Sequence, residues 1–197
     1  MKKLKELTFF DIDDTLFEGK SKVIVKDKET HSIIDELTPG DYNNYKEKES
    51  EYLDFSQFTC TDTFIETSVP MTKTIQILQD FYEIAKKSKS EVYLLTARQD
   101  FDKKEEFLEF LIKNGIDAGH KDKQKVHVFR AGNLPGLNNA EKKYNIIKEM
   151  LKKSKFTTVR LYDDSEENLK AFLNLKIDFP EINVEGYLVN GQNIIKY

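Results

Sequence analysis

Acidic residues follow directly after the first apolar run of this chain. Leu7 to Phe10 are mostly apolar and β-prone, and Asp11, Asp13 and Asp14 come next. A short apolar run bounded by polar residues predicts a buried strand. Carboxylates crowded at its end repel one another and resist desolvation unless a cation lies among them. Oxygen ligands at this density suit Mg²⁺. The run therefore predicts a magnesium site; the alternative is a strand followed by an acidic turn.

The same acids could carry out phosphoryl transfer. Asp11 is the predicted nucleophile, because a carboxylate that attacks phosphorus forms an aspartyl-phosphate and splits one hard displacement into two easier ones. Asp13 projects to the same side and is the predicted general acid and base, which protonates the leaving oxygen and later deprotonates water. The backbone carbonyl of Asp13 is a further expected Mg²⁺ ligand. Asp14 is either a surface or capping acid or a direct participant.

Phosphate-binding groups are expected at the end of a second apolar strand, residues 91–95. Thr96 follows it, and the Thr96 hydroxyl with the next backbone N–H groups, beginning at Ala97, can hold phosphate oxygens. The alternative is that Thr96 merely ends the strand. Arg98 can add a bidentate contact to phosphate or substrate, or it can pair with a surface acid.

A lysine is needed to neutralise charge on the nucleophile and the transferring group. Two adjacent candidates, Lys142 and Lys143, lie on a predicted helix whose buried face is marked by Ile146, Ile147 and Met150. Lys143 shares that face, whereas Lys142 points about 100° away. Helical phase therefore favours Lys143; the alternative is that both lysines face solvent.

Another strand that ends in acids completes the predicted metal site. Asp163 directly follows the predicted strand residues Val159 to Tyr162. Because Mg²⁺ retains waters and uses few carboxylates, Asp11, Asp163 and the Asp13 carbonyl suffice as its protein ligands. Asp164 either supports this shell or caps the next helix.

Taken in order, these segments resemble the four motifs of the haloacid dehalogenase (HAD) superfamily of phosphotransferases. The first matches its Asp-x-Asp-x-Thr signature, and the insertion described below is similar to that of short HAD-like proteins encoded by tailed phages. The matching segments are Asp11–Thr15, Leu94–Arg98, Lys142 or Lys143, and Leu161–Asp164.

The resemblance implies a Mg²⁺-dependent phosphatase, that is, a phosphoric monoester hydrolase. It implies a small phosphorylated substrate, such as a nucleotide or the phosphorylated end of a nucleic acid. An acid at Asp13 favours ester hydrolysis over ATP-driven pumping, since family ATPases lack an acid there. Two alternatives remain open. A phosphomutase needs a larger cap, and a non-catalytic phosphate-binding module would have lost an acid or the lysine.

Strands alternating with helices predict an α/β fold. We expect a three-layer, Rossmann-like core with a mainly parallel sheet of about five strands, formed by residues 1–17 and 70–197. A hairpin signal at Asn190-Gly191 adds a short terminal strand at 193–196. Core strands are expected at 4–11, 91–95, 125–129, 157–162 and 184–189, and helices at 71–87, 101–114, 140–153 and 166–174.

Residues 18–69 interrupt this alternation and predict a flap or cap inserted after the first strand. Val23–Val25 and Ile33–Ile34 flank a polar turn and predict a β-hairpin. Five aromatic residues follow, and they either pack the flap onto the core or stack bases. A polynucleotide substrate would require a basic groove. The aromatic residues are Tyr42, Tyr45, Tyr52, Phe55 and Phe58, and the candidate groove residues are Lys20, Lys22, Lys26, Lys28 and Arg130.

Composition sets wider bounds. A chain of 197 residues can bury one substantial core with a small insertion. The net charge of −4 argues against a generally basic protein that coats nucleic acid. Cys60 is the single cysteine, so no internal disulfide forms and a reducing compartment is expected. No signal peptide or membrane-spanning run is evident, so we expect a cytoplasmic protein without an obligate protein partner.

Overall fold

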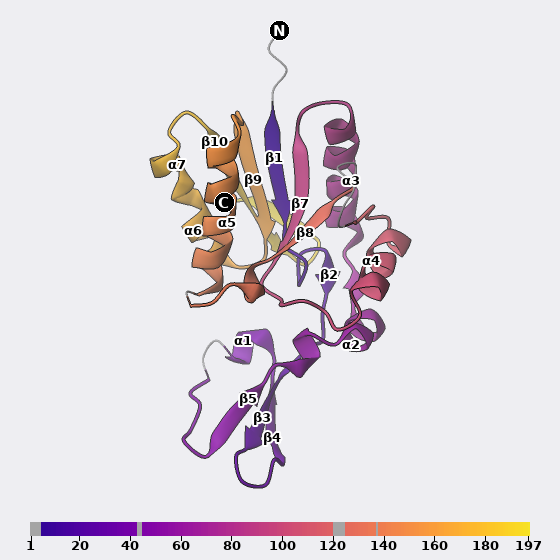
Figure 1. Ribbon diagram of the computed structural model, residues 1–197, viewed down its shortest axis with the longest axis vertical. Helices are drawn as coiled ribbons and strands as arrows, with labels where there is room; N and C mark the ends of the chain where they lie inside the picture. The colour runs from indigo at the N-terminus through magenta and orange to yellow at the C-terminus, as the bar shows by residue number, and fades with distance from the viewer. Residues whose placement is uncertain (1–4, 43–44, 120–124, 137) are drawn as a thin grey trace.

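A six-stranded sheet lies at the centre of the computed structural model, which describes residues 5–42, 45–119, 125–136 and 138–197 (Figure 1). The strand order is β11-β10-β9-β1-β7-β8. Neighbouring strands from β10 to β8 are parallel, and β11 returns antiparallel to β10. The mainly parallel sheet and the terminal strand are confirmed. The strands are β1 (Glu6–Phe10), β7 (Glu91–Thr96), β8 (His127–Arg130), β9 (Thr158–Asp163), β10 (Asn183–Asn190) and β11 (Asn193–Lys196).

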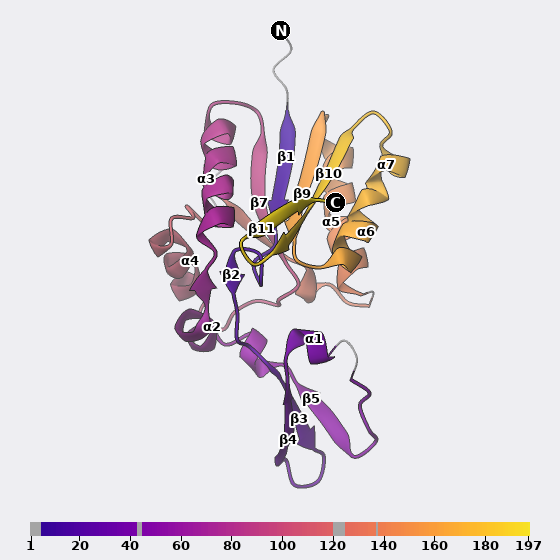
Figure 2. The ribbon, with the colours of Figure 1, turned by 180° about the vertical axis from the view of Figure 1, so that it is seen from behind.

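Helices cover the sheet through two separate apolar clusters. Phe10 belongs to a cluster that includes Leu78 of α3 and Phe107 of α4. Its neighbour Phe9 points to the other face and joins a cluster that includes Ile147 of α5. Accordingly, α5 lies in front of the strands in Figure 1 and behind them in Figure 2. The helices are α3 (Thr72–Lys86), α4 (Lys104–Lys113), α5 (Asn139–Lys153), α6 (Glu166–Leu173) and α7 (Leu175–Asp178).

The insertion leaves and re-enters the core on two paired strands. β2 (Phe17–Glu18) is antiparallel to β6 (Val69–Pro70). Beyond this stem, the expected hairpin of β3 (Val23–Asp27) and β4 (Ile33–Leu37) is present. A third strand, which the sequence analysis did not identify, is β5 (Glu51–Asp54); it pairs with the other edge of β3. Figure 1 shows this small sheet apart from the core, beyond the carboxyl ends of the core strands.

Two short helices connect the small sheet to the core, the 3₁₀ helix η1 (Ser56–Phe58) and α2 (Thr61–Thr67), whereas α1 (Pro39–Tyr42) lies between β4 and β5. Phe64 of α2 is fully buried, and its ring contacts Phe101 and Phe107 of the core. Thus α2 packs as part of the core although it lies within the inserted segment. Among the described helices, none has the length and apolar character needed to cross a membrane.

Candidate active site

The carboxyl ends of β1, β7 and β9 bring the predicted residues to one edge of the sheet. In the parallel register, Phe10 lies opposite both Leu94 and Tyr162. These strands therefore end side by side, and the Asp11 N–H donates a hydrogen bond to the Tyr162 carbonyl at 2.9 Å. Asp11 is the next residue after β1, and Asp163 is the last residue of β9. Their carboxylates consequently enter the site from adjacent strands.

Lys143 lies between these two carboxylates. Its Nζ is 2.9 Å from Asp11 Oδ1 and 2.8 Å from Asp163 Oδ2, and all three side chains are buried. Burial alone would lower the pKa of Lys143, but the charges of Asp11 and Asp163 outweigh it and raise that pKa. Lys142 is only half-buried. Helical phase predicted that Lys143, and not Lys142, lies on the buried face, and this placement is confirmed.

The start of α5 sets this helical phase. Asn138 is its N-cap, because the Asn138 side chain accepts a hydrogen bond from the Glu141 N–H at 2.8 Å. The Glu141 carboxylate accepts a hydrogen bond from the Asn138 N–H in return, at 3.2 Å. This reciprocal capping box fixes the first turn. Lys143 then follows two residues after Glu141, on the face turned to the sheet.

Asp11 has the electrostatic environment of a cation ligand. Burial raises the pKa of its carboxyl well above the ordinary value, and the positive charge of Lys143 offsets this only in part. The ammonium of Lys143 lies 2.9 Å from Asp11 Oδ1 and is the positive charge beside this oxygen. Because Lys143 compensates the buried carboxylate only in part, a divalent cation would stabilise its ionised form further.

Asp164 supplies a third carboxylate that the sequence analysis did not assign as a ligand. One oxygen atom from each of Asp11, Asp163 and Asp164 lies within 4.8 Å of the others. Asp164 is exposed at the rim of the site. Partial desolvation of its carboxyl by the surrounding protein, and then the negative charge of Asp163, nevertheless raise the pKa of Asp164 to about 7. Oxygen donors of this kind suit Mg²⁺, so the residues present fit the predicted metal. The doubled acid at the end of β9 was the available sequence signal.

The start of α6 holds Asp163 in place. Asp163 Oδ1 accepts hydrogen bonds from the Ser165 N–H at 3.0 Å and from the Asn168 amide at 2.8 Å. Ser165, rather than Asp164, is the N-cap of α6. The expectation that Asp164 caps this helix is therefore wrong, and Asp164 is left to face the site. Such supporting hydrogen bonds orient a ligating carboxylate.

Arg98 binds Asp13, the predicted general acid and base. Arg98 Nε lies 2.9 Å from both carboxylate oxygens of Asp13, and Arg98 Nη2 lies 2.7 Å from Oδ1. The Arg98 side chain is 2% exposed, whereas that of Asp13 is 29% exposed. The sequence left two interpretations of Arg98 open, a contact to phosphate or substrate and an ion pair with an acid. In the structure, Arg98 forms an ion pair with an acid. That acid is Asp13 at the site, not a surface residue.

The remaining donors of Arg98 reach the insertion. Arg98 Nη2 donates a hydrogen bond to Ser21 Oγ at 3.1 Å, and Nη1 donates one to the Phe58 carbonyl at 3.0 Å. The rings of Phe58, Phe64 and Phe101 surround the guanidinium, 4.9–5.4 Å away. Arg98 therefore joins Asp13 to both chain segments that enter and leave the small sheet.

The predicted phosphate loop after β7 is held by a close backbone contact. Thr96 is fully buried, and its Oγ1 accepts a hydrogen bond from the Arg98 N–H at 3.0 Å. Ala97 lies between them, against Gly132 in the turn that follows β8. A Cβ at Gly132 would lie 2.3 Å from the Ala97 carbonyl oxygen and 2.6 Å from the Arg98 carbonyl carbon. The sequence analysis did not identify this requirement for glycine.

Asp14 lies on the rim of the site. It adopts a left-handed backbone conformation, with φ +51°, and its Oδ1 accepts a hydrogen bond from the Gly19 N–H at 3.3 Å. Burial, the largest effect, raises its pKa. Asp14, Asp164 and Glu166 line a cavity of about 370 Å³ beside Asn190. The capping interpretation of Asp14 fits this turn.

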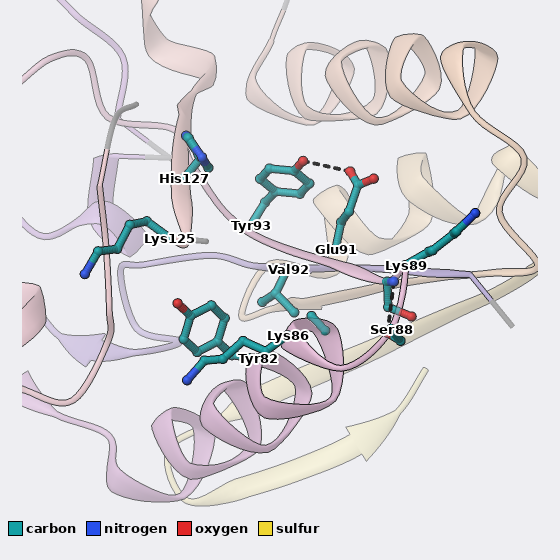
Figure 3. Close-up of a pocket in the computed structure, with 11 residues that line it drawn as sticks. Tyr82, Lys86, Ser88, Lys89, Glu91, Val92, Tyr93, Lys125 and His127 are labelled. Carbon is teal, nitrogen blue, oxygen red and sulfur yellow. Dashed lines mark hydrogen bonds between the residues drawn. The ribbon is translucent and has the colours of Figure 1, made fainter. Parts of the chain in front are cut away.

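A larger cavity of about 630 Å³ lies elsewhere, at the amino end of β7 (Figure 3). None of the predicted catalytic residues lines it. Tyr93 there donates a hydrogen bond to Glu91, and Lys86 pairs with Glu83. The larger cavity is therefore not the candidate site, which is chosen for its convergence of ionisable groups.

Comparisons with protein-family models, with curated proteins and with solved structures find no match for this chain.

Proposed function

We propose that this protein is a Mg²⁺-dependent phosphomonoester hydrolase that acts through an aspartyl-phosphate on Asp11, with a three-layer, Rossmann-like core of HAD type. One observation carries the proposal. Lys143 lies within 3 Å of carboxylates from two adjacent strand ends, Asp11 and Asp163. The loop at Thr96 ends the neighbouring strand. Ligands of open parallel sheets bind at this edge.

Each residue has a defined part in the proposed reaction. An Asp11 oxygen attacks phosphorus while Asp13 gives a proton to the departing alkoxide, so that an acyl phosphate forms and the alcohol leaves. Asp13 then takes a proton from water, whose oxygen attacks phosphorus and releases the Asp11 carboxylate and inorganic phosphate. Lys143 stabilises the negative charge, and the Thr96 hydroxyl and Ala97 N–H hold phosphoryl oxygens.

The acids would hold the metal at the same edge. Asp11, Asp163, the Asp13 carbonyl and, on its geometry, Asp164 are the proposed protein ligands. Bound Mg²⁺ would supply positive charge that neutralises the phosphoryl oxygens. In the structure, the Asp13 side chain pairs with Arg98, which fixes where its carboxylate lies at the site.

Charge favours a small substrate, such as a nucleoside monophosphate, over the phosphorylated end of a nucleic acid. Residues 18–69 contain twelve acidic side chains and six lysines. In this insertion, Lys22 pairs with Glu36 and Lys26 pairs with Asp54. Two of the candidate groove lysines are thus paired with neighbouring acids, and a polyanion would meet net negative charge on the insertion.

Hydrolysis of a panel of phosphate esters, with and without Mg²⁺, tests the proposal. The panel includes a nucleoside monophosphate, a 5′-phosphorylated oligonucleotide and a small aryl phosphate. We expect Mg²⁺-dependent hydrolysis that a chelator stops. Asp11→Asn should abolish turnover with the fold intact, and Asp13→Asn should lower the rate by about 10²–10⁴. Near wild-type activity in either variant, or hydrolysis that resists the chelator, would overturn the mechanism. Phosphate binding without turnover would favour a binding module instead.

A further inference from the structure

Three aromatic side chains of the insertion form a chain of ring contacts, which we call the aromatic strip: Phe58, Phe55 and Tyr42. The rings of Phe58 and Phe55 lie 6.4 Å apart, and those of Phe55 and Tyr42 lie 5.4 Å apart. The last pair meets almost at a right angle, with an interplanar angle of 85°. Two perpendicular rings make a corner that can take a planar ring against one face.

The strip is exposed at its outer end, unlike the other aromatic residues of the insertion. Phe55 is 42% exposed and Tyr42 is 37% exposed. Tyr45 instead packs on the small apolar cluster and donates a hydrogen bond to Glu51, and Tyr52 makes a hydrogen bond with His31. Packing therefore accounts for Tyr45 and Tyr52 but leaves ring surface of Phe55 and Tyr42 in contact with solvent.

The inner end of the strip adjoins the candidate active site. The Phe58 ring lies 5.0 Å from the Arg98 guanidinium, which holds the Asp13 carboxylate. Asp13 is the proposed proton donor to the leaving oxygen, so the strip begins on the leaving-group side of the substrate. Figures 1 and 2 both place α1, which ends at Tyr42, at the end of the insertion that faces the core.

We propose that Phe55 and Tyr42 form a subsite that stacks the base of a nucleoside monophosphate. This inference rests on the proposed function and names its substrate class. Stacking on an aromatic face tolerates any base, since every base has a π-face. A neutral base is also compatible with the acidic insertion, where a second phosphate would be repelled. A phenol ring shares the planar chemistry, and the test below separates the two.

Equilibrium binding tests the subsite without turnover. In an Asp11→Asn background, calorimetry would give the Kd of adenosine monophosphate in the presence of Mg²⁺. We expect Phe55→Ala and Tyr42→Ala each to weaken this binding about tenfold, the usual value of one stacking contact. Tyr52→Ala is the matched control on the same small sheet and should leave the Kd unchanged. Both tested residues are exposed, so the variants should fold.

Turnover of three substrates by chains with Asp11 intact identifies the ligand. Phe55→Ala should raise the KM of adenosine monophosphate about tenfold while the hydrolysis of glycerol phosphate, which has no ring, stays unchanged. An equal loss on both substrates, no change on either, or a loss confined to phosphotyrosine would overturn the subsite. If the wild type hydrolyses no ester but binding still depends on Phe55, the proposed function fails and the subsite stands.

Discussion

The core sheet and the small sheet of the insertion are built on different amounts of buried apolar surface. The core has large apolar clusters on both faces, and its charged site is fixed among them. The small sheet has one small cluster, whose buried members are Val23, Val25 and Leu37. Burial of three such side chains supplies only about 5–9 kcal/mol before the cost of ordering the chain. The small sheet therefore depends on its attachment to the core.

Beside the packing of Phe64, that attachment includes specific polar contacts. Arg98 donates hydrogen bonds to Ser21 and Phe58 on the two entering segments. Asp102 of the core accepts hydrogen bonds from both the N–H and the hydroxyl of Thr61, at 2.9 and 2.7 Å. The candidate catalytic groups thus lie among the large clusters of the core, whereas few polar contacts join the small sheet to it. The predictions below test this division of roles.

The largest expected effect lies in the core. Lys143→Ala removes the positive charge between two buried carboxylates and should lower kcat at least about 10²-fold. Lys142→Ala is the matched control, one residue away and half-buried, and should retain near wild-type kcat. Steady-state kinetics, with circular dichroism to check folding, compares the two. Inactivity confined to the Lys142 variant would refute the assignment from helical phase.

A smaller loss is expected from Gly132→Ala, which adds one methyl group beside the phosphate loop. Its Cβ would lie 2.3 Å from the Ala97 carbonyl oxygen, so the loop must move. Such a displacement should reduce kcat/KM roughly 10- to 100-fold. Gly186→Ala is the control, because its nearest neighbour is a flexible Leu169 methyl at 3.4 Å. Equal kinetics for both variants would show that the loop geometry is unimportant.

Arg98→Lys should affect the local stability of the small sheet but not that of the core sheet. Lysine keeps the charge but loses the planar fork that binds Asp13, Ser21 and Phe58 together. We expect amide hydrogen exchange in β3 and β5 to become about tenfold faster, since local opening of the insertion becomes easier. Exchange in β9 and β10 should not change. Uniformly faster exchange in both sheets would mean that Arg98 stabilises the core as a whole.

These predictions also mark what the sequence could indicate. The strand-end acids and the phase of Lys143 are local patterns, because hydrophobic periodicity places each side chain on a face. The contact between Arg98 and Asp13 joins residues 85 positions apart and has no local pattern. The need for glycine at position 132 has no local pattern either, because it arises from the backbone of residues 97 and 98 in another loop. Asp164 was ambiguous because capping and ligation favour the same residue types.

The insertion was predicted less completely for a related reason. Its hairpin has two β-branched runs separated by a polar turn, and this pattern is local. β5 has the sequence Glu51-Tyr52-Leu53-Asp54, which is short and largely polar. It becomes a strand only because β3 offers a free edge for pairing. Tertiary pairing thus outweighed a weak local propensity.

The smallest expected effect compares one carboxylate in each sheet. In the core, Glu185 is partly buried, which opposes ionisation. Hydrogen bonds from Lys196 and Asn183, with the charge of Arg160, nevertheless lower its pKa to about 2. In the insertion, a hydrogen bond from Lys26 lowers the pKa of Asp54 to about 2. A carboxyl whose pKa is lower in the folded state stabilises the fold above its unfolded pKa, and this stabilisation is lost as the pH falls towards 2.

Glu185→Gln should therefore lower the free energy of unfolding by about 1 kcal/mol at pH 7, because solvent screens its exposed partner Lys196, and the deficit should shrink as the pH falls from about 4.5 towards 2. Urea unfolding across this pH range measures it. Asp54→Asn should leave global unfolding almost unchanged, because the small sheet can open before the core unfolds. Its effect should appear instead as faster hydrogen exchange in β3. A global loss from Asp54→Asn as large as that from Glu185→Gln would show that the two sheets unfold as one cooperative unit.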